Sequence, residues 1–155
     1  MNKLQLSSFM KIRDGTLDGF KQQAAECISQ TREKDTGTLQ YDWFLSIDQS
    51  ECEVREAFES SEALIDHWHN LENALGKLSE LFDYNTIVIY GDPSPRLLKE
   101  VKTRMSDDRW KVYSSLKPDQ WRRVMRSNPL EKRRIKQKNS RFMAWSLGRN
   151  FASGL

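Results

Sequence analysis

The amino-acid sequence predicts an α+β fold with the ferredoxin-like split βαβ plan, in which the elements run strand, helix, strand, strand, helix, strand. Two observations predict it. Apolar and polar residues alternate in three short segments, a fourth short segment is rich in residues that favour strands, and apolar residues recur every three or four positions in two longer segments. The chain has 155 residues, of which 37% are hydrophobic, so it is long enough for one domain but too short for two.

The first strand and the first helix each have a clear apolar side. Residues 4–12 are predicted to form a strand whose apolar side consists of Leu4, Leu6, Met10 and Ile12. After Asp14-Gly15, Thr16 can cap a helix over residues 17–34. The apolar positions of this helix follow three- and four-residue spacing: Leu17, Phe20, Ala24, Cys27 and Ile28.

The next two strands are predicted to form a hairpin. Residues 38–47 alternate, with Tyr41 and Trp43 on the apolar side, and a turn at residues 48–50 follows. The run over residues 52–58 alternates again, and Val54, Glu56 and Phe58 share one side of it.

The second half of the predicted domain repeats the pattern. Ser60 and Ser61 offer caps for a helix over residues 61–82. Its apolar stripe consists of Leu64, His67, Trp68, Leu71, Ala74, Leu75, Leu78 and Phe82. A strand over residues 85–90 completes the plan. Ser94 followed by Pro95 then predicts a third helix, and residues 109–116 a further strand.

Charge divides the chain into two parts. Residues 1–92 carry 8 Lys and Arg against 17 Asp and Glu, a net charge of −9, whereas residues 93–155 carry 17 against 5, a net charge of +12. We assign residues 1–117 to the folded domain and residues 118–155 to a basic C-terminal extension with interleaved aromatic residues. We expect this extension to fold back on an acidic surface of its own chain or of a partner. The alternatives are a contact with single-stranded nucleic acid and a disordered tail.

The sequence predicts neither a membrane-spanning segment nor an export signal. No run approaches the roughly 18–20 apolar residues that a span needs, and the residues after Met1 alternate instead of forming a continuous apolar region. Cys27 and Cys52 have no second cysteine at metal-ligand spacing. We therefore expect a cytoplasmic protein with free thiols and no membrane contact.

Glu56 and His67 are the candidate acid–base residues. Glu56 shares the inward side of its strand with apolar neighbours, and a buried carboxylate must be paired, hydrogen-bonded or functional. His67 lies on the apolar stripe of the helix over residues 61–82, so the two side chains can meet if that helix packs on the strand. Such a pair suits general base catalysis, although a structural pair that ties helix to sheet fits equally well. His69 points to another side of the helix and is not expected to join His67 in a metal site.

Aromatic residues can supply the walls of a pocket. Tyr41 and Trp43 lie side by side on one strand face, and Phe58 and Trp68 complete the candidate substrate-binding set. This arrangement can hold a flat organic ring, although packing beneath a helix or in a dimer explains it as well. The sequence has no glycine-rich phosphate loop, zinc-ligand spacing or nucleophile elbow, so nucleotide hydrolysis, zinc chemistry and α/β-hydrolase chemistry are not expected, and no metal site is proposed.

Two segments resemble the antibiotic biosynthesis monooxygenase family. They are the run Gly37-Thr38-Leu39-Gln40-Tyr41-Asp42-Trp43-Phe44 and the run over residues 55–64 followed by His67. With the turn over residues 91–95 and the helix and strand after it, the resemblance extends over residues 3–116. Members of this family are small ferredoxin-like proteins that pair into dimeric α+β barrels. The resemblance implies a homodimer in which two four-stranded antiparallel sheets meet, and a cofactor-independent oxygenase acting on quinols or polycyclic phenols.

Glu56 and His67 match the recurring Glu and His positions of the family. The haem-degrading branch, by contrast, has an Asn on the first strand and a His ten residues after a Trp on the second helix. Here Leu78 follows Trp68 at that distance, so haem degradation is not expected. The expected role of His67 is to accept a proton from a small aromatic substrate, with Glu56 orienting it. The alternative is a non-catalytic protein of the same fold that binds a small molecule or nucleic acid.

Overall fold

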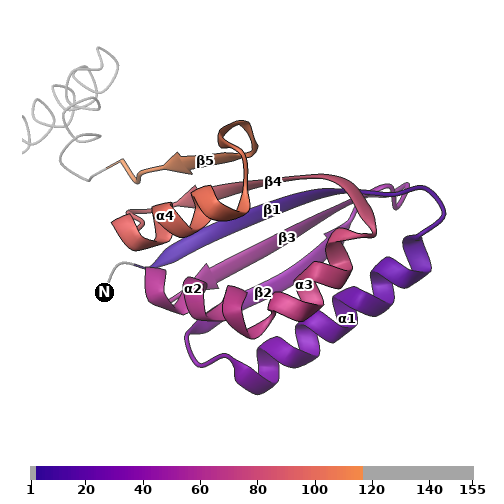
Figure 1. Ribbon diagram of the computed structural model, residues 1–155, viewed down its shortest axis with the longest axis horizontal. Helices are drawn as coiled ribbons and strands as arrows, with labels where there is room; N and C mark the ends of the chain where they lie inside the picture. Colours follow the sequence, from indigo (N-terminus) through magenta and orange to yellow (C-terminus); the bar gives the residue numbers. More distant parts are fainter. Residues whose placement is uncertain (1–2, 117–155) are drawn as a thin grey trace, which may run out of the picture. The chain divides into compact units, whose positions relative to one another are not determined.

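The predicted order of elements is present in the computed structural model of the chain, which describes residues 3–116 (Figure 1). The elements are β1 (Leu4–Ile12), α1 (Leu17–Lys34), β2 (Thr38–Leu45), β3 (Glu51–Phe58), α2 (Ser61–Asn70), α3 (Glu72–Ser79), β4 (Phe82–Tyr90), α4 (Pro95–Arg104), a 3-10 turn (Asp107–Arg109) and β5 (Trp110–Tyr113). The ferredoxin-like α+β class is confirmed. The predicted basic extension, residues 118–155, lies outside the described residues.

The strands form one sheet in the order β2-β3-β1-β4-β5. Strand β1 pairs antiparallel with both β3 and β4, and β2 pairs antiparallel with β3. The predicted sheet of four antiparallel strands is thus extended by a fifth, because β5 pairs with β4 in parallel. A parallel pair needs a crossover, and α4 supplies it by carrying the chain from the end of β4 back to the start of β5.

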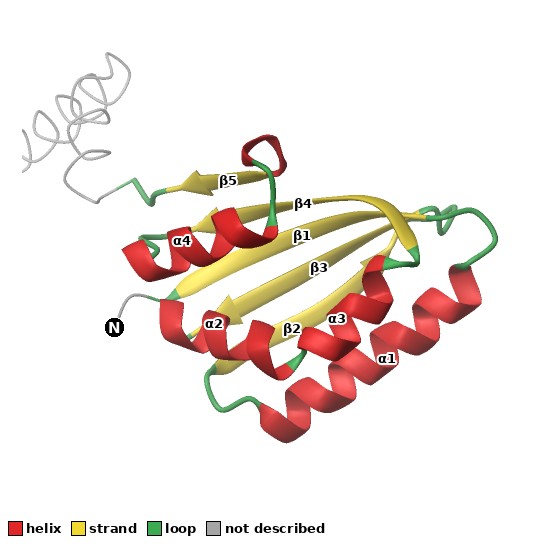
Figure 2. Ribbon diagram, viewed as in Figure 1, coloured by secondary structure: helices red, strands yellow, loops and turns green. Residues whose placement is uncertain are grey.

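The four helices described here lie on one face of the sheet (Figure 2). Side chains alternate along each strand, so every second residue of β1 and β3 faces these helices. The predicted apolar side of β1 is fully buried, as is most of the inward side of β3. Buried residues of the helices cover this inner face: Phe20 and Cys27 on α1, and Leu64 and Leu71 at α2.

The predicted helix over residues 61–82 is instead two helices. Helix α2 ends at Asn70, Leu71 leaves helical geometry with φ −102° and ψ 5°, and α3 begins at Glu72. The chain then enters β4 at Phe82, three residues before the predicted strand. Periodicity missed the break because both helices bury the same side against one sheet, so the apolar stripe continues through Leu71.

Two of the three predicted caps are present. Ser60 accepts a hydrogen bond from the backbone N–H of Ala63, and Ser94 accepts one from that of Leu97, each at 3.2 Å. Thr16 is different, because its hydroxyl lies 2.8 Å from the carbonyl of Arg13 and 3.0 Å from that of Leu81. Thr16 thus ties the loop before α1 to the link between α3 and β4.

The other face of the sheet has no covering helix among the described residues. Several aromatic side chains on this face are more than 40% exposed: Phe9, Phe44, Tyr84, Tyr90 and Tyr113. Polar residues lie between them, and Ser7 donates a hydrogen bond to Glu53 across the pair of strands β1 and β3. This outer face is therefore aromatic and polar, unlike the apolar inner face.

Candidate active site

His67 lies on the buried side of α2. It follows the buried Leu64 by three positions and precedes the buried Leu71 by four, so the three side chains point the same way. The side chain of His67 is 2% exposed. The prediction that His67 faces the interior is therefore correct.

Asp35 contacts one nitrogen of the His67 ring. It is the residue at the end of α1, and its side chain is 3% exposed. Asp35 Oδ2 lies 2.5 Å from His67 Nδ1, Thr38 Oγ1 donates to the same oxygen at 2.7 Å, and Asn70 Nδ2 donates to Oδ1 at 2.8 Å. Because a carboxylate only accepts, this pairing places a proton on Nδ1. In the neutral ring Nε2 is then free to accept a proton.

Hydrogen bonds keep the Asp35 side chain ionised. Burial pushes the pKa of Asp35 upward, but the hydrogen bonds from His67, Asn70 and Thr38 outweigh burial and hold the pKa below its usual value. The site therefore contains a fixed negative charge directly behind His67.

A close contact at Gly37 brings Asp35 to His67. A Cβ placed on Gly37 would lie 2.5 Å from the Cβ of Ala63 on α2. The carbonyl of Gly37 also accepts a hydrogen bond from the backbone N–H of Glu59 at 3.0 Å. The segment after α1 thus packs against the start of α2 with no room for a side chain, and Asp35 lies within reach of the ring.

Glu56 lies on the other side of the His67 ring. Glu56 Oε2 is 3.6 Å from His67 Nε2 and has no hydrogen-bond partner among the described residues. Burial, followed by the charge of Asp35, raises the pKa of Glu56 from 4.5 to about 8. Near pH 7 Glu56 is therefore mainly a neutral carboxylic acid, which can donate a hydrogen bond.

The predicted aromatic residues divide between a cavity and the core. The centroid of the Tyr41 ring lies 4.9 Å from that of the His67 ring, and Trp43 packs edge-on against Tyr41. Tyr41, Trp43 and Trp68 line the cavity described below, but Phe58 does not. Phe58 is fully buried, and the centroid of its ring lies 5.2 Å from that of the His67 ring, so its side chain packs against His67 in the core. Its end-of-strand position places it beneath α2 instead.

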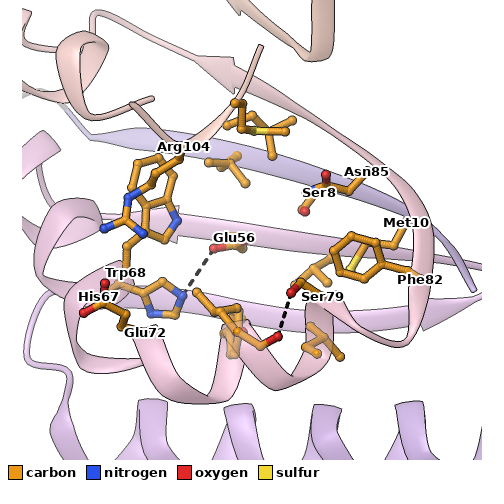
Figure 3. A pocket seen from close by; sticks show the side chains of 18 of the residues that line it. Ser8, Met10, Glu56, His67, Trp68, Glu72, Ser79, Phe82, Asn85 and Arg104 are labelled. Carbon is orange, nitrogen blue, oxygen red and sulfur yellow. Dashed lines mark hydrogen bonds and ion pairs between the residues drawn. The ribbon is translucent and has the colours of Figure 1, made fainter. Parts of the chain in front are cut away.

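A cavity of about 360 Å³ lies between the inner face of the sheet and helices α2, α3 and α4 (Figure 3). Its apolar walls come mainly from Leu6, Met10, Trp43, Val54, Leu75, Phe82 and Ile87. His67 and Glu56 border it, and Ser8, Ser79, Asn85 and Arg104 add polar groups. This volume and this mainly apolar lining are typical of a small-molecule site.

His69 and the two cysteines lie outside the cavity lining. His69 is half-exposed, with Nε2 3.3 Å from Glu100 Oε1, and no group of metal ligands is found in residues 3–116. Cys27 and Cys52 are buried free thiols, and burial raises the pKa of Cys27 to about 12 and that of Cys52 to about 11. Neither thiol forms an appreciable thiolate at neutral pH.

Sequence reasoning missed Asp35, Ser8, Asn85 and Arg104. Asp35 lies on no periodic face, so no pattern singles it out. The period of two does place Ser8 on the same side as Leu6 and Met10, which is a signal that was available.

Part of the chain matches a known protein family. The family described as antibiotic biosynthesis monooxygenase matches residues 7–75. No curated protein matches the chain. No helix in residues 3–116 has the length and apolar character needed to cross a membrane.

Solved structures share the fold at low sequence identity. MupZ from Pseudomonas fluorescens is 16% identical with a TM-score of 0.59, and the match covers 75% of this chain and 91% of MupZ. Rv0793 from Mycobacterium tuberculosis is 20% identical with a TM-score of 0.53, covering 59% of this chain and 96% of that one. A structure described as antibiotic biosynthesis monooxygenase is 19% identical with a TM-score of 0.52, covering 59% and 99%. Residues 7–75 thus match the antibiotic biosynthesis monooxygenase family, in agreement with the resemblance of the sequence.

Proposed function

We propose that this protein is a monooxygenase that oxidises a quinol or polycyclic phenol with dioxygen and needs no cofactor. The observation that carries the proposal is the buried Asp35–His67 pair at the edge of an apolar cavity of suitable size. A base in contact with a mainly apolar, partly aromatic cavity is the arrangement needed to deprotonate a phenol. The family of residues 7–75 supports the same reaction class.

His67 is the proposed base. Its Nε2 accepts the phenolic proton, and the Asp35 carboxylate at Nδ1 stabilises the imidazolium that forms. The electron-rich phenolate then reacts with dioxygen. One oxygen atom forms a new carbonyl on the ring and the other leaves as water, so a phenol and dioxygen give a quinone and water. The substrate supplies all four electrons that dioxygen takes up, and no outside reductant is needed.

Asp35, rather than Glu56, is the proposed positioning residue for His67. The Asp35–His67 separation is 2.5 Å, whereas Glu56 lies 3.6 Å away, beyond a normal hydrogen bond. Glu56, with its raised pKa, is the proposed proton donor. Its O–H can bind the substrate oxygen and can protonate the oxygen that leaves as water.

Oxygen uptake over a panel of quinols and anthrones tests this function. We expect uptake with at least one compound, and a loss of about 10²–10⁴-fold in kcat/KM for His67→Ala, because one general base contributes that much. His69→Ala on the same helix is the matched control and should keep full activity, since His69 faces Glu100 outside the cavity. Full activity in His67→Ala would remove the proposed base. No uptake with any compound would favour a binding protein that keeps the fold.

We also propose that two copies of the chain pair through the outer faces of their sheets. The aromatic residues on that face, Phe9 and Phe44 among them, are exposed in a single chain and would be covered in a symmetric pair. In sedimentation at micromolar concentration the protein should be a dimer. Phe44→Glu should weaken the dimer, whereas Ile47→Glu, in the turn after β2, should not. A monomeric wild-type protein would refute the proposal.

A further inference from the structure

The cavity has a second polar end that the proposed reaction does not use. Ser8 on β1 and Asn85 on β4 both line the cavity, and Figure 3 draws them together, away from His67. Ser8 pairs with Ile87 and Met10 pairs with Asn85, so Ser8 and Asn85 are diagonal neighbours on the inner face. Neither side chain has a hydrogen-bond partner among the described residues. Two unused polar groups in an otherwise apolar wall indicate a place for a ligand oxygen.

Sheet register gives the separation of the two polar ends. Glu56 pairs with Leu6, whereas Asn85 pairs with Met10, and β1 lies between their strands. The two residues are thus two strands and four positions apart, or about 16 Å between Cα atoms at the usual spacings. Side chains stand roughly perpendicular to a sheet, so about the same distance separates their polar ends, and a hydrogen bond of about 3 Å at each end leaves about 10 Å for the ligand. That length suits three linearly fused rings with an oxygen at each end.

Trp43 on β2 adds a third polar atom, in the same row of the sheet as Ser8. Trp43 pairs with Val54, and Val54 pairs with Ser8, so Trp43 belongs to the row between those of Glu56 and Asn85. Trp43 lines the cavity, and its Nε1 is buried without a hydrogen-bond acceptor in the described part of the chain.

We propose that Ser8 and Asn85 form a second oxygen-binding subsite, which makes the protein select linear polycyclic aromatics that carry oxygen at both ends. The inference rests on the proposed function only in naming the His67 end as the reacting one. Asn85 can donate to a carbonyl or accept from a hydroxyl, and Ser8 can do either, so both oxygen types fit.

Binding of two inert probes tests the subsite. The compounds 2,6-dihydroxyanthraquinone and 2-hydroxyanthraquinone differ by one hydroxyl, and both are already oxidised. Quenching of tryptophan fluorescence at about pH 6 gives each Kd. Wild-type protein should bind the dihydroxy probe about five- to tenfold more tightly, the value of one added hydrogen bond. Asn85→Leu should abolish this preference, and Ser8→Ala should reduce it. The monohydroxy probe should keep its Kd within about twofold, because its hydroxyl binds at the stronger His67–Glu56 end.

Thr86→Ala is the matched control, because Thr86 follows Asn85 on β4 but pairs with Phe9 on the outer face. It should retain the full preference. Equal affinity of wild-type protein for the two probes, or binding of neither, would overturn the subsite. An equal loss for both probes in Asn85→Leu and Ser8→Ala would also overturn it, by indicating a structural role. Selective binding without oxygen uptake would refute only the proposed reaction, whereas uptake without selectivity would refute only the subsite.

Discussion

Asp35→Asn should lower kcat for oxygen uptake by about 10²–10⁴-fold and leave KM almost unchanged. Asparagine keeps the shape of the side chain but removes the charge that stabilises the imidazolium. Its amide can also donate to Nδ1, which would place the ring proton on Nε2 and block the proposed base. The effect thus falls on the chemical step and not on substrate binding.

Asn70→Ala is the control for this variant. It removes the hydrogen bond to Asp35 Oδ1 but leaves the contact between Oδ2 and His67 intact. We expect a loss of activity no greater than about tenfold, because the charge behind the ring remains. The pH profile of kcat separates the explanations, since loss of the charge should move the profile in Asp35→Asn and not in Asn70→Ala. Activity of Asp35→Asn within about threefold of wild type would refute the positioning role.

Glu56→Gln should make the protein more stable at high pH. Because the pKa of Glu56 is raised from 4.5 to about 8 on folding, the folded state holds one proton more than the unfolded state between these values. The contribution of Glu56 to the free energy of unfolding is therefore fully present below about pH 4.5. It is lost as the pH rises towards about 8, at about 1.4 kcal/mol per pH unit. Glutamine is neutral at every pH and removes that loss.

Urea unfolding from pH 5 to pH 9 measures the difference. The stability gain of Glu56→Gln should be small at pH 5, grow through neutral pH and reach several kcal/mol by pH 8 to 9. Glu51→Gln, at the exposed start of the same strand, corrects for the loss of one negative charge. A gain that is the same at every pH would contradict the raised pKa of Glu56.

Periodicity predicted the parts of the fold that one repeat governs. Strand β1 and helix α1 have the predicted bounds, because alternation and three- to four-residue spacing each persist over their length. The break at Leu71 and the parallel pairing of β5 were not predicted. Neither feature changes the hydrophobic periodicity of the sequence, because both depend on how the helices and strands pack together.

The candidate site was predictable where it lies on strands and helices. Glu56 and His67 each belong to a periodic face, so packing of the helix on the sheet brings them to 3.6 Å. Asp35 follows a helix in a connecting segment, where no repeat indicates the direction of a side chain. Only the three-dimensional contact between that segment and α2 reveals it as the strongest partner of His67.

The close contact between Gly37 and Ala63 limits which substitutions this protein can accept during evolution. The contact leaves no space for a methyl group, and it holds the segment that carries Asp35. Any larger residue at position 37 would push that segment outward and separate the carboxylate from the ring. A random mutagenesis screen for lost turnover should therefore recover substitutions of Gly37, a residue that lies outside the cavity lining. Under the proposed function, selection for activity would therefore act on this backbone contact as well as on the side chains that line the cavity.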